Sequence, residues 1–136
     1  MLTVQQGPKR PRRVTEKSFE DAFGKALLAC GFKNWHVNMR DKGWPDRYVR
    51  HGIWIEFKSL DAGAKLTART SDQLDVWQKI RMVELAQAGD RVFYAARYDN
   101  QVIFSAYPFP MTLPNLPRFA YKDKRDLEQI IRMFIC

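Results

Sequence analysis

The chain is poor in cysteine and histidine, with two of each among its 136 residues. Cys30 falls on the apolar face of an expected helix, and Cys136 ends the sequence. Two such cysteines do not form a disulfide framework, and the isolated His36 and His51 do not provide a set of zinc ligands. These shortages argue against a secreted disulfide scaffold and against a zinc protein, and they favour a reducing, cytoplasmic setting.

Long apolar runs are also lacking, and the N-terminus has no apolar stretch of the kind found in signal peptides. No membrane association is therefore expected. Acidic residues are outnumbered 15 to 23 by lysine and arginine, which gives a net charge of +8. A basic excess of this size favours a polyanionic partner, of which nucleic acid is the commonest. A basic helix with the apolar face that a membrane surface requires is not found.

The length is sufficient for one domain with one core. Residues 1–14 are polar and predict a flexible basic arm, which either contacts phosphates or only aids solubility. Its cations are Lys9, Arg10, Arg12 and Arg13. Residues 15–107 are expected to form the domain. Residues 108–136 predict a proline-rich connection and an amphipathic helix, which packs on the same domain or forms a dimer contact.

The most informative segment is residues 53–60, where β-branched and aromatic residues alternate with polar ones. This pattern predicts a strand on which Glu56 and Lys58 share one face, with the apolar residues on the other. A turn at residues 51–52 would fold the preceding segment back as a hairpin and bring Asp46 to the same place. Two carboxylates and a lysine at one point are suited to a hard divalent cation and a phosphodiester.

Pro45-Asp46 followed by Glu56-Phe57-Lys58 resembles the signature of the PD-(D/E)XK nucleases. The Gly-x-Pro-Asp form of residues 43–46 is most similar to the virus-type replication-repair nucleases (VRR-NUC) and to phage Holliday junction resolvases. The resemblance spans roughly residues 16–98. It implies an α/β, restriction-endonuclease-like core, a mixed sheet flanked by helices. The expected order is helix, three strands, helix and two strands, followed by the C-terminal helix.

The same resemblance implies the roles of the motif residues. Asp46, Glu56 and the backbone carbonyl of Phe57 are expected to bind Mg²⁺, with Mn²⁺ as a substitute and no organic cofactor. Lys58 is expected to orient or help deprotonate the attacking water and to stabilise charge on the phosphate.

Two further catalytic residues are expected from the flanking helices, and each has an alternative. The helix expected at residues 15–30 should supply a further carboxylate that extends the metal site, with Glu20 as first choice and Glu16, one turn earlier, as second. The helix expected at residues 72–88 should supply a glutamine that faces the site. Gln73 is preferred because it stands at the helix start, and Gln78 is the alternative.

Substrate contacts are expected from Trp44, which the following proline holds extended, and from Lys65 and Arg69 in a polar loop. Trp54 shares the face of Glu56 and is expected to pack under the first helix, with base stacking as the alternative.

The resemblance implies a magnesium-dependent DNA endonuclease that acts on branched DNA as a homodimer, in a bacterium or a phage-infected cell. One alternative is a DNA-binding module that retains the nuclease fold without catalysis. Another is an assembly protein that associates through its C-terminal helix.

Overall fold

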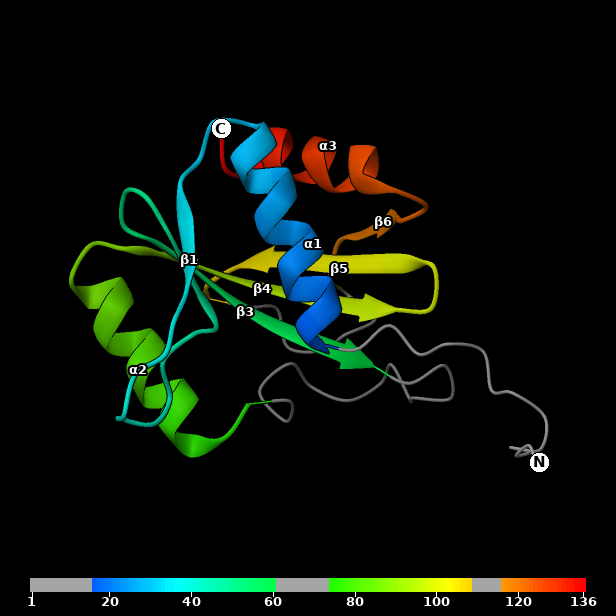
Figure 1. The fold of residues 1–136 in the computed structure, drawn as a ribbon. Helices are drawn as coiled ribbons and strands as arrows, with labels where there is room; N and C mark the ends of the chain where they lie inside the picture. Colours follow the sequence, from blue (N-terminus) through cyan, green and yellow to red (C-terminus); the bar gives the residue numbers. More distant parts are fainter. Residues whose placement is uncertain (1–15, 61–73, 109–115) are drawn as a thin grey trace, which may run out of the picture.

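The computed structural model describes residues 16–60, 74–108 and 116–136 (Figure 1). Three helices and six strands follow one another in the described residues. In chain order they are α1 (Glu16–Ala29), β1 (Asn34–His36), β2 (Arg47–Val49), β3 (Ile53–Leu60), α2 (Val76–Gln87), β4 (Arg91–Tyr98), β5 (Gln101–Ala106), β6 (Arg118–Ala120) and α3 (Lys124–Phe134). Among the residues so described, no helix has the length and apolarity needed to cross a bilayer.

The six strands form a single sheet in the order β1-β2-β3-β4-β5-β6. β3 and β4 are parallel, because the chain crosses over through α2 between them, and every other neighbouring pair is antiparallel. The expected fold class, a mixed central sheet flanked by helices, is confirmed.

The alternating pattern of β3 divides the interior into two layers. Ile53, Ile55 and Phe57 belong to the core on the side of α1 and α3. On the other side, Trp54 packs with residues of α2 and β4 in a second, smaller core. Because side chains alternate along a strand, Glu56 shares the α2 side of the sheet with Trp54. The expectation that Trp54 packs under the first helix is therefore wrong.

The C-terminal helix packs within the larger core, the first of the two arrangements expected for it. Leu127, Ile130 and Ile131 of α3 are buried together with Phe19 and Phe23 of α1. Asp123 caps α3 by accepting a hydrogen bond from the backbone N–H of Arg125.

Two element boundaries differ from expectation, and one strand was not expected. β1 is limited to residues 34–36 instead of 35–40. α2 begins at Val76 instead of residue 72, because Asp75 and Gln78 form a reciprocal capping box. β6 follows directly on Pro117 and has three residues, which is too short for an alternating pattern to reveal, and it forms by pairing with β5.

Candidate active site

Asp46 and Glu56 are brought together by the hairpin of β2 and β3. The antiparallel register places Arg47 opposite Ile55, so one further step along the two chains places Asp46 opposite Glu56. Asp46 Oδ2 accepts a hydrogen bond of 2.8 Å from the backbone N–H of Phe57. This bond fixes the Asp46 carboxylate to the backbone of the strand that carries Glu56 and Lys58.

Glu56 is buried, with an exposed fraction of 1%. Its Oε2 atom accepts a hydrogen bond of 2.7 Å from Gln78 Nε2 and lies 3.5 Å from Lys58 Nζ. Its Oε1 atom is also buried and has no hydrogen-bond partner among the residues that the structure describes. A buried carboxylate oxygen without a donor is costly, which makes Oε1 available to a ligand that enters the site.

The charges of the site are out of balance. The pKa of Glu56 is raised from its ordinary 4.5 to about 8, chiefly by burial and next by the charge of the Asp46 carboxylate, while Lys58 opposes both effects. Burial also raises the pKa of Asp46, against the hydrogen bond from Phe57, and Glu20 adds to the increase. One lysine does not neutralise the buried Glu56 and the half-buried Asp46, so an additional cation would stabilise their ionised forms.

Glu16 lies beside this pair at the first residue of α1. Partial burial raises the pKa of Glu16, the charge of Lys58 lowers it, and the charge of Asp46 raises it again. A hydrogen bond from the backbone N–H of Ser59 further lowers this pKa. Figure 1 shows the reason for these contacts, because the first turn of α1 lies beside the C-terminal end of β3.

Glu20, the preferred acid of the first helix, is buried in an ion pair instead. Its Oε2 atom lies 3.1 Å from Arg47 Nη2 and 2.7 Å from His36 Nδ1, and the residue is 4% exposed. Glu20 contributes to the potential at Asp46, but its carboxylate is engaged by β1 and β2. Of the two acids expected from this helix, Glu16 is therefore the one in the surroundings of Lys58 and Ser59.

A glycine in the middle of α1 makes room for this ion pair. Arg47 Nη1 donates a hydrogen bond of 2.8 Å to Asn34 Oδ1, and Asn34 Nδ2 donates one of 3.1 Å to the carbonyl of Gly24. A Cβ atom at Gly24 would lie 2.8 Å from Arg47 Nη1 and 3.0 Å from Asn34 Oδ1. The guanidinium thus links β2, directly after Asp46, to α1.

Gln78 is the glutamine that contacts the site in the described residues. Its side-chain oxygen accepts a hydrogen bond of 3.0 Å from the backbone N–H of Asp75, while its nitrogen donates to Glu56. The same side chain therefore caps α2 and orients the acid. The Asp-x-x-Gln spacing of a capping box is the sequence feature that favours Gln78. Gln73, the preferred candidate, lies outside the described residues.

Trp44 is the one expected DNA contact that falls in the described part of the chain. The centroid of its ring lies 5.2 Å from that of Trp54, and the Arg81 guanidinium carbon lies 4.3 Å from the centroid of the Trp44 ring. The remaining expected contacts lie outside the described residues, namely Lys9, Arg10, Arg12, Arg13, Lys65 and Arg69.

The site fits a hard divalent cation in its donor chemistry. Within the described residues no group of three histidine, cysteine or acidic side chains gathers as a metal site by itself. Asp46 and the buried Oε1 of Glu56 offer carboxylate oxygens as metal ligands. The Phe57 side chain is fully buried in the core, so Phe57 can contribute to the site only through its backbone. Mg²⁺ prefers a coordination shell in which a few oxygens come from the protein and several come from water molecules.

No protein-family model matches the chain, and no curated protein matches it in sequence. Among solved structures, the chain is similar to Hjc of Archaeoglobus fulgidus, a Holliday junction resolvase from an archaeal hyperthermophile. The match has a TM-score of 0.52 at 13% sequence identity and covers 84% of this chain and 98% of that one. At this identity the likeness shows the fold, which is restriction-endonuclease-like as expected.

Replacing Glu56 by glutamine is expected to stabilise the metal-free protein at neutral and alkaline pH. Because the folded-state pKa of about 8 exceeds the ordinary 4.5, the stability that proton binding adds is complete below about pH 4.5 and is lost as pH rises through about 8. The wild type should lose up to about 1.4 kcal/mol per pH unit over this range relative to Glu56→Gln. Urea denaturation in a chelator at a series of pH values measures the difference.

Glu84→Gln is the matched control, since Glu84 is exposed on α2. Its stability should follow that of the wild type with pH. Parallel curves for Glu56→Gln and the wild type would contradict the raised pKa.

Gly24→Ala is expected to destabilise the fold by roughly 1–3 kcal/mol, as overpacking does. An alanine in a helix interior ordinarily stabilises by up to about 1 kcal/mol, so the sign is diagnostic. Arg47 cannot swing away cheaply because it is 8% exposed and is bound to Asn34 and Glu20. In a Glu20→Gln/Arg47→Met background the penalty should be much smaller, because only the contact with Asn34 Oδ1 is then left. Thermal or urea denaturation of the four proteins checks this, and a stabilised Gly24→Ala single variant would refute the crowding.

Proposed function

We propose that this chain is a divalent-metal-dependent endonuclease that hydrolyses phosphodiester bonds in branched DNA such as Holliday junctions. The observation that carries the proposal is the placement of Asp46 opposite the buried Glu56, with Lys58 3.5 Å from Glu56 Oε2. The fold similarity to a Holliday junction resolvase and the net charge of +8 support it. The closer relation to the VRR-NUC group stays a prediction from the Gly-x-Pro-Asp motif.

Asp46, Glu56 Oε1 and the Phe57 carbonyl would hold the metal, with Mg²⁺ preferred and Mn²⁺ as a substitute. When bound, the metal supplies Lewis-acid polarisation of the scissile phosphate and lowers the pKa of a bound water. The chain's own contribution is orientation. The Phe57 N–H holds one Asp46 oxygen, and Gln78 holds Oε2 of Glu56, which leaves Oε1 for the site.

Lys58 is the protein side chain that supplies positive charge to the site. Its side chain is 22% exposed, so the ammonium reaches the edge of the site where a DNA phosphate would enter. There it would donate hydrogen bonds to the phosphate oxygens as charge develops and orient the attacking water.

We assign the further acid of the site to Glu16 and give Glu20 a positioning role. Glu16 lies in the surroundings of Lys58 and Asp46, whereas Glu20 is paired with Arg47. Because Arg47 directly follows Asp46, the buried ion pair between Glu20 and Arg47 fixes the position of β2 relative to α1.

The finer features of the proposal concern assembly and setting. A symmetric four-way junction requires two cuts, and a homodimer of a small domain would supply them. The protein would then act in the cytoplasm of a bacterium or of a phage-infected cell.

Lys58→Ala is expected to lower cleavage by roughly 10²–10⁴-fold while the protein stays folded, because the phosphate loses its charged donor. The assay measures cleavage of matched four-way, flap and linear DNAs with Mg²⁺ and with chelator. Cleavage should require the metal and should be fastest on the four-way junction. Lys79→Ala, on α2, is a lysine control that should cleave as the wild type does.

Mg²⁺ should also raise the midpoint of thermal unfolding of the wild type, since a ligand that binds the folded state stabilises it. The increase should be smaller in Asp46→Asn. DNA binding that depends only on salt, with no metal-dependent cleavage of any substrate, would favour the non-catalytic binding module instead.

Glu16→Gln and Glu20→Gln should separate activity from stability. Glu16→Gln should lower single-turnover cleavage by roughly 10²-fold or more with little loss of stability, because it removes a charge from the site. Glu20→Gln should lower the free energy of unfolding by about 1–3 kcal/mol, because it weakens the partner of a buried arginine. The reverse pattern would show that Glu20 is the acid that serves the site.

A further inference from the structure

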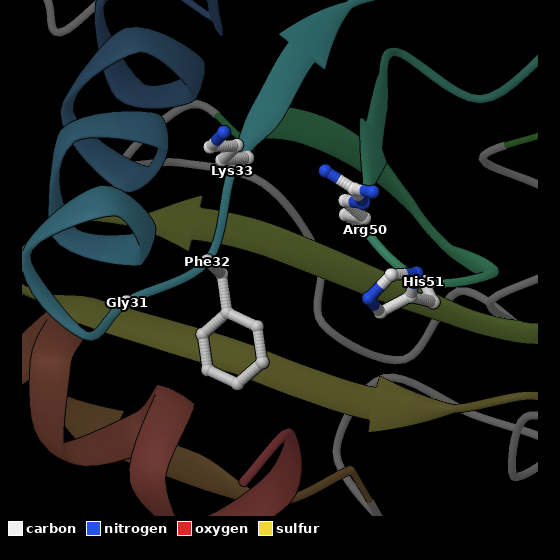
Figure 2. Close-up of a pocket in the computed structure, with 5 residues that line it drawn as sticks. All are labelled: Gly31, Phe32, Lys33, Arg50 and His51. Carbon is white, nitrogen blue, oxygen red and sulfur yellow. The ribbon is translucent and has the colours of Figure 1, made fainter.

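A hollow of about 310 Å³ lies at the corner of the sheet remote from the acids, and none of the candidate catalytic residues lines it. Figure 2 shows its lining, which comes from the end of α1 and from the turn between β2 and β3. The lining residues are Gly31, Phe32, Lys33, Arg50 and His51. Lys33, Arg50 and His51 are all exposed, so the hollow opens to solvent.

The two cations of the hollow are held opposite each other by the sheet. β1 and β2 pair with Asn34 opposite Val49, and the next step places Lys33 opposite Arg50. The backbone N–H of Arg50 donates a hydrogen bond of 3.0 Å to the carbonyl of Lys33, which extends the pairing to these residues. Like charges directly opposite on neighbouring strands destabilise the sheet unless an anion lies between them.

No described carboxylate lies within ion-pair distance of either cation. In the part of the chain that the structure describes, neither Lys33 nor Arg50 forms an ion pair. Asp90 lies beside Gly52, but its Oδ2 atom accepts a hydrogen bond of 2.9 Å from Trp54 Nε1, on the α2 side of the sheet. The Asp90 carboxylate is therefore already engaged, and it forms no ion pair with Lys33 or Arg50.

The carbonyl groups at the end of α1 do not oppose an anion strongly either. The carbonyl of Leu28 accepts a hydrogen bond from the Gly31 N–H, and that of Leu27 accepts one from the Phe32 N–H. These bonds satisfy the last turn of the helix and reduce the negative potential that an uncapped C-terminus would present.

We propose that this hollow binds a backbone phosphate of the same DNA that enters the candidate active site. The inference rests on the proposed function and adds a second contact point for the substrate. Arg50 lies four positions after Asp46 along an extended strand, which corresponds to roughly 13 Å. One strand of duplex DNA advances about 3.4 Å per base pair, so the phosphate would lie roughly four base pairs from the cleaved bond.

Lys33→Ala/Arg50→Ala should weaken binding of a four-way junction in chelator by roughly 10–100-fold at low salt. Loss of this one phosphate contact should also reduce the slope of log K against log [salt] by about 1. Lys124→Ala/Arg125→Ala, at the start of α3, removes the same net charge at residues that do not line the hollow and is the control. Its affinity and its slope should stay near those of the wild type.

Shortening the arms of the junction locates the contact. The wild type should lose affinity when the arms are cut from about 15 to about 3 base pairs, beyond the reach of the hollow at about 3.4 Å per base pair. Lys33→Ala/Arg50→Ala should lose much less, because its contact to the longer arm is already gone.

The possible results separate this inference from the proposed function. If Lys33→Ala/Arg50→Ala binds with the affinity and salt slope of the control, the hollow is not a phosphate site, and the endonuclease proposal stands. If its deficit is as large on the short arms as on the long ones, the remote contact is refuted. If the wild type binds none of these DNAs, the proposed function itself fails.

Discussion

Antiparallel pairing between β2 and β3 is the constraint on which the candidate site depends. The hairpin turns at Gly52, whose φ of 70° suits a residue without a side chain, and this sets the register. Asp46 then comes opposite Glu56, and its carboxylate accepts the Phe57 N–H. A slip of one residue would move Asp46 to the other face of the sheet, away from Glu56 and into the layer of α1.

The two buried acids, Glu20 on α1 and Glu56 on β3, have opposite surroundings. Glu20 is paired with Arg47, and Asn34 and Gly24 hold the guanidinium in place. Glu56 contacts Gln78 and the partly exposed Lys58, keeps one oxygen without a described donor, and has its pKa raised to about 8. A protein gains nothing in stability from the second arrangement, which is typical of a site that uses a perturbed group.

Much of the fold and part of the site could be predicted from local patterns. The alternation of residues 53–60 correctly placed Glu56 on the face opposite Phe57, and the hairpin turn correctly predicted the pairing of β2 with β3. The choice between Glu16 and Glu20 could not be made in this way, because residues one turn apart on a helix share a face. Arg47 decides where Glu20 points, and it comes from a different part of the chain.

The sequence by itself determined the sheet's alternation, the basic charge and the spacing that puts a carboxylate and a lysine side by side on one strand, because these depend on neighbours only a few residues apart. Only the tertiary structure decided which acid of α1 lies near Lys58, that Gln78 holds Glu56, and that Lys33 faces Arg50 across two strands. Each of these features is a contact between elements that are far apart in the sequence. Which contact forms depends on the burial and the charge pairing that result when those elements pack together.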